Sequence, residues 1–205
     1  MSGVADSKVG RLVRHALGAA LSPIRAGEEK IASHKPQTTG PTTLHLTSEA
    51  FANGAPIPTK YASNASGGEN VSPALAWSGV PDRTRELVLI VEDPDAPMAN
   101  PFVHWILHRL SPTIRNLPMG VPTTTQVPAL QGAVQGQNDM KKRGWYGPEP
   151  PLGHGVHHYH FQLFALDTQL SISPEASVKD LVAAMKGHVL AEGEIIGTYE
   201  RKGTS

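Results

Sequence analysis

The sequence has no cysteine among its 205 residues, and this absence excludes disulfide bonds, thiolate catalysis and any zinc site that uses cysteine. It also lacks an apolar run approaching the roughly 18–20 residues that a membrane-spanning helix needs. Near the N-terminus, the apolar stretch at residues 16–21 is short and is followed at once by Pro23 and Arg25, unlike a secretory signal peptide. The sequence therefore predicts a cytoplasmic protein without an integral membrane segment.

An excess of charge of one sign is also missing. The chain carries 18 Lys and Arg against 18 Asp and Glu, so its formal net charge is zero. A balanced chain has no global electrostatic attraction for nucleic acid or for an acidic membrane. Phosphate-loop, dinucleotide-binding and Gly-x-Ser-x-Gly fingerprints are absent as well. We therefore expect no nucleic-acid partner, no cofactor and no serine nucleophile.

Glycine and proline are abundant, with 20 and 18 residues, while the hydrophobic fraction is 39%. This composition favours a turn-rich β fold over a helix bundle. Four apolar or alternating runs have the length and pattern of β-strands, at residues 86–92, 102–110, 159–166 and 191–199. In the second run, period-two alternation places His104, Ile106 and His108 on one face of the strand.

The polar stretch between the second and third predicted strands, residues 111–144, is rich in Pro, Thr, Gln and Gly. A loop this long in a compact domain usually lines a site or is partly disordered. Residues 177–186 predict a helix, with Ser177 as N-cap, Asp180 in a capping-box position and Gly187 as the stop. The main domain is therefore predicted to be mainly β, with few helices.

The first 43 residues indicate an extension that precedes this domain. Apolar residues recur there at helical spacing, at Val9, Leu12, Val13, Ala16, Leu17 and Ala20. Residues 33–41 are polar and contain two prolines, which is typical of a linker. We divide the chain into a helical extension with linker, residues 1–43, and a domain, residues 44–205. The apolar helix face fits its own domain or a second copy in a homodimer; a membrane-surface helix is the alternative.

Two rigid turns rich in Pro and Gly lie beside the residues that carry chemistry. The first, residues 93–97 (DPDAP), directly follows a predicted buried strand, so Asp93 is placed at the rim of a sheet. Its prolines fix the backbone of the turn. Aspartates in such turns also accept hydrogen bonds from turn amides, and this is the alternative to a role in a site.

The second turn begins at Gly147 and leads into a cluster of histidines. Clustered imidazoles suggest a metal site, but adjacent His157 and His158 point to opposite sides of a strand. His157 and Tyr159 share a face, which favours a polar His–Tyr wall over a metal site. His104 completes the set, although a lone strand histidine is often a hydrogen-bonded core residue. Together these residues predict a small, rigid pocket.

Residues 93–97 followed by His104, and residues 147–161 (GPEPPLGHGVHHYHF), together resemble the phosphatidylethanolamine-binding protein (PEBP) family. Residues 137–139 (QND) and the tail 187–199 resemble its bacterial YbhB/YbcL branch of Raf kinase inhibitor-like proteins. The resemblance covers residues 44–201. It implies an antiparallel β-sandwich with a few peripheral helices, in agreement with the predicted strands.

The resemblance also implies a non-enzymatic pocket for a small anion, either phosphate or the phosphorylated head group of a lipid. The pocket residues that it implies are Asp93, His104, His157 and Tyr159, with Pro150 and Pro151 as its wall and Phe102 at its border. An imidazolium and a phenol donate hydrogen bonds to phosphate oxygens. Glu149 stands where the family commonly has a small residue or Cys, and its carboxylate opposes an anion unless it points to solvent.

Two other functions stay open. Some relatives inhibit a kinase or a protease, and the extension and residues 111–144 are the surfaces available for such a protein partner. A hydrolase that uses Asp93 and His157 as acid and base is a further alternative. Because no activated nucleophile is visible beside a base, the sequence favours a binding protein over an enzyme.

Overall fold

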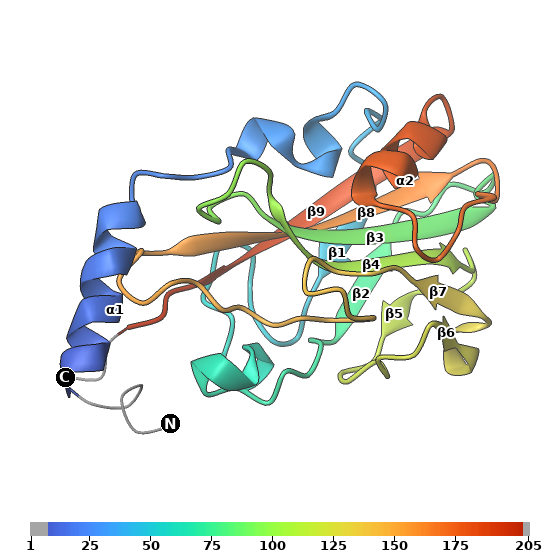
Figure 1. Ribbon diagram of the computed structural model, residues 1–205. Coiled ribbons are helices and arrows are strands. Elements are labelled where there is room, and N and C mark those ends of the chain that lie inside the picture. Colours follow the sequence, from blue (N-terminus) through green and yellow to red (C-terminus); the bar gives the residue numbers. More distant parts are fainter. Residues whose placement is uncertain (1–7, 203–205) are drawn as a thin grey trace.

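The structure, a computed structural model, describes residues 8–202 and shows two antiparallel β-sheets packed against each other (Figure 1). The smaller sheet has the order β1-β2-β5, from His45–Thr47, Leu75–Ser78 and Asn116–Leu117. The larger sheet has the order β6-β7-β4-β3-β8-β9. Its strands are β6 (Gln126–Val127), β7 (Ala133–Gln135), β4 (Phe102–Leu110), β3 (Glu86–Asp93), β8 (His157–Leu166) and β9 (Val189–Tyr199). The prediction of a mainly β, antiparallel fold with peripheral helices is confirmed.

The helices lie around these sheets. The α-helices are α1, Lys8–Leu21, and α2, Val178–Met185. Short 3₁₀ turns are formed by Glu28–Lys30, Ala32–His34, Thr59–Tyr61, Asn64–Ser66 and Pro128–Leu130. In α2 the predicted capping box is present, because Ser177 and Asp180 each accept the other's backbone N–H. Two backbone N–H groups at the start of α2, which have no partner within the helix, are therefore hydrogen-bonded.

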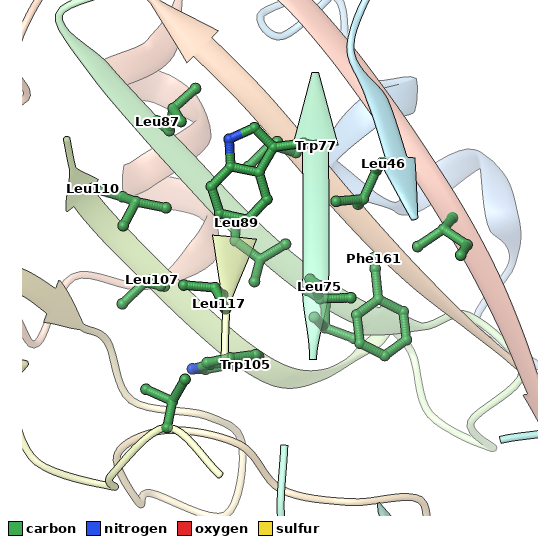
Figure 2. Packing of buried hydrophobic residues seen from close by; sticks show 14 of the residues in the cluster. Leu46, Leu75, Trp77, Leu87, Leu89, Trp105, Leu107, Leu110, Leu117 and Phe161 are labelled. Carbon is green, nitrogen blue, oxygen red and sulfur yellow. The ribbon is translucent and has the colours of Figure 1, made fainter. Parts of the chain in front are cut away.

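The main hydrophobic core fills the space between the two sheets (Figure 2). Leu75 of β2 points into this space from the smaller sheet, and Leu89, Trp105 and Phe161 point into it from the larger one. The indole N–H of Trp105 donates to Gln135 Oε1 at 2.7 Å, so the buried polar atom of this ring is paired. Burial of these large side chains provides most of the driving force that holds the two layers together.

A second apolar cluster lies on the outer face of the larger sheet. There Val88 and Ile90 of β3 and Phe164 of β8 pack with Leu181 and Met185 of α2. Because β3 carries apolar residues on both faces, it is buried along its whole length. This explains why the sequence shows a continuous apolar run there rather than an alternating one.

The segment that follows α1 runs along the outer face of the larger sheet (Figure 1). The backbone N–H of Ala32 donates to Glu92 Oε2 at 2.7 Å, and that of Ser33 donates to Gln162 Oε1 at 2.6 Å. Thr38, inside the stretch predicted as a linker, is fully buried. The segment therefore packs on the sheet and provides hydrogen bonds to two buried polar side chains, a role that its polar composition did not reveal.

A β-bulge in β4 overturns one prediction about strand faces. Val91 pairs with Trp105 and Glu92 pairs with Val103, so His104 is the extra residue of the bulge. Val103 consequently packs in the outer cluster with Ile106, whereas His104 contacts Tyr159 on the inner side. Placing His104 and Ile106 on one face was wrong, because period-two alternation does not continue through a bulge.

Residues 111–144 are not one open loop. They contain β5, which pairs with β2, and β6 and β7, of which β7 pairs with β4. Each strand is only two or three residues long, so no hydrophobic period was present to detect. The prediction of one uninterrupted loop over this stretch is therefore wrong at these short strands.

α1 stands at one end of the sheets, beside the loop that precedes β8 (Figure 1). Gly18 faces this loop so closely that a Cβ atom there would overlap the carbonyl oxygen of Leu152. Within residues 8–202, neither helix combines the length and the apolarity that a membrane crossing requires.

Candidate functional site

Asp93 and His157 lie next to each other at one end of the larger sheet. Asp93 is the last residue of β3 and His157 is the first of β8, the antiparallel neighbour of β3. Asp93 Oδ2 accepts a hydrogen bond from His157 Nδ1 at 2.7 Å, and both side chains are buried. Asp93 Oδ1 accepts from the backbone N–H of Asp95 at 2.8 Å. Asp93 thus closes its own turn and also holds the imidazole.

A cavity of about 260 Å³ opens beside this pair. Five of the six predicted site residues line it, namely Asp93, His104, Pro150, Pro151 and His157. The sixth, Tyr159, is fully buried and packs edge-to-face against His104, with 5.0 Å between the ring centroids. The structure therefore brings together residues from β3, β4, β8 and the loop before β8.

The rest of the cavity wall was mostly not predicted. It is formed by Ala96, Pro97, Met98, Phe102, Met140, Tyr146 and Glu149. The family resemblance implies Phe102 at the border, and Met140 belongs to residues 111–144, for which the sequence predicts a loop that lines a site or is partly disordered. No sequence signal points to Met98 or to Tyr146. These residues come from loops far apart in the sequence, and only the tertiary fold collects them.

His157 also contacts a second imidazole. Its Nε2 lies 2.6 Å from Nδ1 of His154, and Nε2 of His154 lies 2.9 Å from the backbone carbonyl oxygen of Leu21 at the end of α1. A continuous hydrogen-bonded chain therefore runs from Asp93 through both rings to α1. His154 was recognised as part of the histidine cluster, but its link to the N-terminal helix joins residues 133 positions apart.

The hydrogen-bonding capacity of these groups determines their protonation. The ionised Asp93 and the Leu21 carbonyl only accept, so His157 donates from Nδ1 and His154 donates from Nε2. The bond between the rings needs a third proton, whereas two neutral imidazoles carry two. The chain with all three bonds made therefore holds one positive charge on the His157–His154 pair, beside the Asp93 carboxylate. Burial lowers the pKa of His154. Within residues 8–202 no metal-ligating cluster is present.

One buried polar atom near the cavity lacks a protein partner in the part of the chain that the structure describes. This atom is the Tyr159 hydroxyl, which makes no hydrogen bond. Burial, followed by the Asp93 charge, raises the pKa of Tyr159 well above its usual value, so this hydroxyl stays a donor. His104 Nδ1 donates to the Tyr146 carbonyl oxygen at 2.6 Å, and burial lowers the pKa of His104. A neutral His104 presents its Nε2 lone pair as an acceptor.

The carboxylate of Glu149 does not point away from the cavity. It lines the wall and accepts a hydrogen bond from the hydroxyl of Tyr146. Burial and then this contact with Glu149 raise the pKa of Tyr146 to about 12. The cavity thus presents a negative group on one wall and, on another, the His157 ring of the protonated His157–His154 pair.

A second cluster of polar side chains surrounds Asp95, outside the cavity. Asp95 Oδ2 accepts from the backbone N–H and from Nδ1 of His158, both at 2.7 Å, and Arg25 forms an ion pair with Asp95. Burial opposes ionisation, but these bonds lower the pKa of Asp95. His158 is on the exposed side of β8, as the alternation predicted. Asp95 therefore anchors the segment after α1 rather than lining the cavity.

Comparison with known proteins agrees with this fold. A family model described as phosphatidylethanolamine-binding protein matches residues 47–200. A UPF0098 protein of Pyrococcus horikoshii is 46% identical over 155 residues, which cover 76% of this chain and 76% of the relative. A PEBP homolog from Chlamydia trachomatis is 40% identical, with a TM-score of 0.68 over 78% of this chain and 98% of that one. E. coli YbcL is 32% identical, with a TM-score of 0.72 over 78% and 99%.

The chain therefore belongs to the phosphatidylethanolamine-binding protein family. Within this family it falls in the bacterial and archaeal UPF0098, YbcL-like branch. The family match begins at residue 47, so α1 and the segment up to residue 46 lie outside it.

Proposed function

We propose that the cavity beside Asp93 binds a phosphorylated head group that carries a primary amine, such as phosphoethanolamine, and that the protein acts as a binding module. The observation that carries this proposal is the buried, unpaired Tyr159 hydroxyl, which lies beside the neutral His104 ring and its Nε2 acceptor. Leaving a buried polar group unpaired is unfavourable. A ligand that accepts from the Tyr159 hydroxyl removes this penalty, and the same ligand can donate to His104 Nε2.

A phosphate monoester supplies both kinds of group. Its oxygens accept from the Tyr159 hydroxyl, and its remaining P–OH donates to His104 Nε2. The protonated His157–His154 pair adds positive charge beside the cavity, although both nitrogens of His157 are engaged by protein side chains. The pair therefore acts on the phosphate through its charge and not through a direct hydrogen bond from His157.

Glu149 supports the amine part of the proposal. Its carboxylate opposes a bare phosphate but attracts an ammonium group across the same small cavity. The volume of about 260 Å³ suits a head group rather than a large ligand. A zwitterionic head group matches the two opposite charges of the wall better than inorganic phosphate does.

The arrangement of His157 also supports binding over hydrolysis. A general base needs a free nitrogen to take the proton of a nucleophile. His157 Nδ1 is bonded to Asp93 and Nε2 to His154, so neither nitrogen is free.

Calorimetric titration tests this proposal with inorganic phosphate, ethanolamine and phosphoethanolamine. We expect phosphoethanolamine to bind more tightly than phosphate. Tyr159→Phe lowers the affinity for phosphate and for phosphoethanolamine by about tenfold or more, which is the effect of losing a hydrogen bond to a charged group. The thermal stability of this variant is not lowered. Glu149→Gln removes only the preference for phosphoethanolamine.

Tyr199→Phe is the matched control, because its hydroxyl bonds Ser66 outside the cavity. Its affinities stay at the wild-type level. If none of the three ligands binds at millimolar concentration, or if Tyr159→Phe binds like the wild type, the proposal is wrong.

A further inference from the structure

The hydrogen bonds at the two ends of the His157–His154 pair fix two of its protons. Asp93 Oδ2 accepts from His157 Nδ1 at 2.7 Å, and the carbonyl oxygen of Leu21 accepts from His154 Nε2 at 2.9 Å. An ionised carboxylate and a backbone carbonyl only accept. The protons on these two nitrogens are therefore set by the partners, and only the contact between the rings can differ between the neutral and the charged pair.

A neutral pair does not fit this arrangement. Two neutral imidazoles carry two protons, and the bonds to Asp93 and to Leu21 use both. The facing nitrogens, His154 Nδ1 and His157 Nε2, would then be two unprotonated acceptors held 2.6 Å apart. Two buried acceptors without a donor are unfavourable, and a third proton between the rings removes this conflict. The positive charge thus depends on how His154 is oriented.

The carbonyl that orients His154 belongs to the N-terminal extension. Leu21 is the last residue of α1, and the family match begins only at residue 47. The helix is seated through its small side, because Gly18 is buried against the backbone of Leu152. The apolar side, including Leu17, is exposed, so the expected packing of this side on the domain is wrong. The position of α1 therefore decides whether the Leu21 carbonyl reaches the site.

Displacement of α1 would bring water to the His154 ring in place of the Leu21 carbonyl. Water donates as well as accepts, so His154 can then carry its proton on Nδ1 and accept at Nε2. In this tautomer Nδ1 donates to His157 Nε2, and every bond is made with two protons. The neutral pair loses its conflict, and the third proton is no longer required.

Other charged and titratable groups also face the pair, namely Asp93, His104, Glu149, Arg25 and, on α1 itself, His15. Arg25 is anchored by its ion pair with Asp95, and the backbone N–H of Ala26 donates to the carbonyl oxygen of Ala96 at 3.0 Å. These contacts lie beyond the end of α1 and hold Arg25 when the helix moves. His15 is exposed, so water weakens its electrostatic effect on the pair. The Leu21 carbonyl is therefore the main group that α1 brings to the pair.

We propose that His154, oriented by the Leu21 carbonyl, is a positioning residue that keeps the His157–His154 pair protonated, and that the seating of α1 thereby controls the positive charge beside the cavity. Coupling between two sites is reciprocal, so an anion that favours the charged pair also favours the seated helix. This consequence for ligands rests on the proposed function, whereas the charge of the pair does not.

Nitrogen-15 NMR of the imidazole rings tests the role of His154 in the full chain without ligand. In His154→Gln the amide N–H donates to Leu21 and the amide oxygen accepts from His157, so His157 stays protonated at both nitrogens near neutral pH. In His154→Leu no acceptor faces His157. We expect His157 to lose its second proton at a pH lower by about one unit or more than in His154→Gln, the effect of one hydrogen bond to a charged group.

His188→Leu is the matched control, because this histidine is paired with Asp167 and not with the site. The titration of the His157–His154 pair is unchanged in this variant.

Gly18→Val tests the part that α1 plays, because a side chain at this position overlaps the backbone of Leu152. We expect the pair to lose its third proton at a lower pH than in the wild type. Water that reaches the rings favours the charged form, so hydration alone shifts the loss in the opposite direction. Ala19→Val places the same side chain at an exposed position of the helix and leaves the titration unchanged.

Three results overturn the proposal. A wild-type pair that holds only two protons near neutral pH contradicts the charge. Equal titration of His157 in His154→Leu and His154→Gln contradicts the role of His154. A Gly18→Val titration identical to that of the wild type contradicts control by α1. Since none of these measurements uses a ligand, their failure is distinct from failure of the proposed function, which only the calorimetric titrations decide.

Discussion

His157 is hydrogen-bonded to Asp93 on one side of its ring and to His154 on the other. Its position beside Asp93 follows from the two motifs, and its face of β8 follows from alternation. Its charge depends on His154, and the orientation of His154 depends on a carbonyl of α1. Only the assembled chain of hydrogen bonds shows that the site contains an imidazolium.

Glu92 gives a prediction that depends on pH. Burial raises the pKa of this carboxyl group above its usual value, so its contribution to stability is present at low pH and is lost as the pH rises through the folded-state pKa. In Glu92→Gln the amide oxygen still accepts from Ala32, but nothing ionises. We expect the melting temperature of the variant, relative to wild type, to increase from about pH 5 to about pH 8.

Thermal unfolding followed by circular dichroism at several pH values measures this difference. Glu49→Gln is the control, because Glu49 is exposed, and its offset from wild type stays constant. A constant offset for Glu92→Gln as well would show that burial of Glu92 does not govern the pH dependence.

Among the secondary-structure elements, the long strands and α2 are those that the sequence located well. Both have a regular hydrophobic period, and α2 has its capping box. The bulge at His104 and the short strands β5 to β7 have no such signal. The division of the chain at residue 43 stays a prediction, while the contacts of Ala32 and Ser33 show that the segment after α1 packs on the sheet.

The seating of α1 leads to a prediction about Gly18. A side chain at this position overlaps the backbone of Leu152, which cannot retreat as a flexible side chain does. Gly18→Val therefore displaces α1 and breaks the bond between Leu21 and His154. We expect amide hydrogen exchange in α1 to become faster, whereas the core strands β3 and β8 keep their protection.

Ala19→Val is the matched control, because it places the same side chain at an exposed position of the same helix. Valine has a higher helix propensity than glycine, so loss of propensity cannot explain faster exchange in Gly18→Val. If both variants accelerate exchange equally, a valine anywhere in α1 has this effect, and the close approach to Leu152 does not explain the result.

The protein as a whole is held together by the core between its two sheets. Leu89 is fully buried there, in a cluster that includes residues of both sheets. We expect Leu89→Ala to reduce the free energy of unfolding by about 2–5 kcal/mol, the range for a leucine truncated in a packed core. Denaturant titration followed by tryptophan fluorescence measures this loss.

Met119→Ala, at an exposed position, changes the free energy of unfolding by less than about 0.5 kcal/mol. A similarly small effect of Leu89→Ala would mean that the surrounding core residues relax to fill the cavity left by the leucine.

By itself the sequence determined the β class of the fold, the family, the long strands and α2, and the two turns that bring residues to the site. These features depend on local hydrophobic periodicity and on rigid Pro and Gly turns. Both can be recognised within a short segment of the sequence. The tertiary structure decided the inward turn of His104, the contact between the His157 and His154 rings, the presence of Glu149 in the cavity wall and the outward apolar face of α1. Each of these depends on contacts between residues distant in the chain, and no local pattern of residues specifies such contacts.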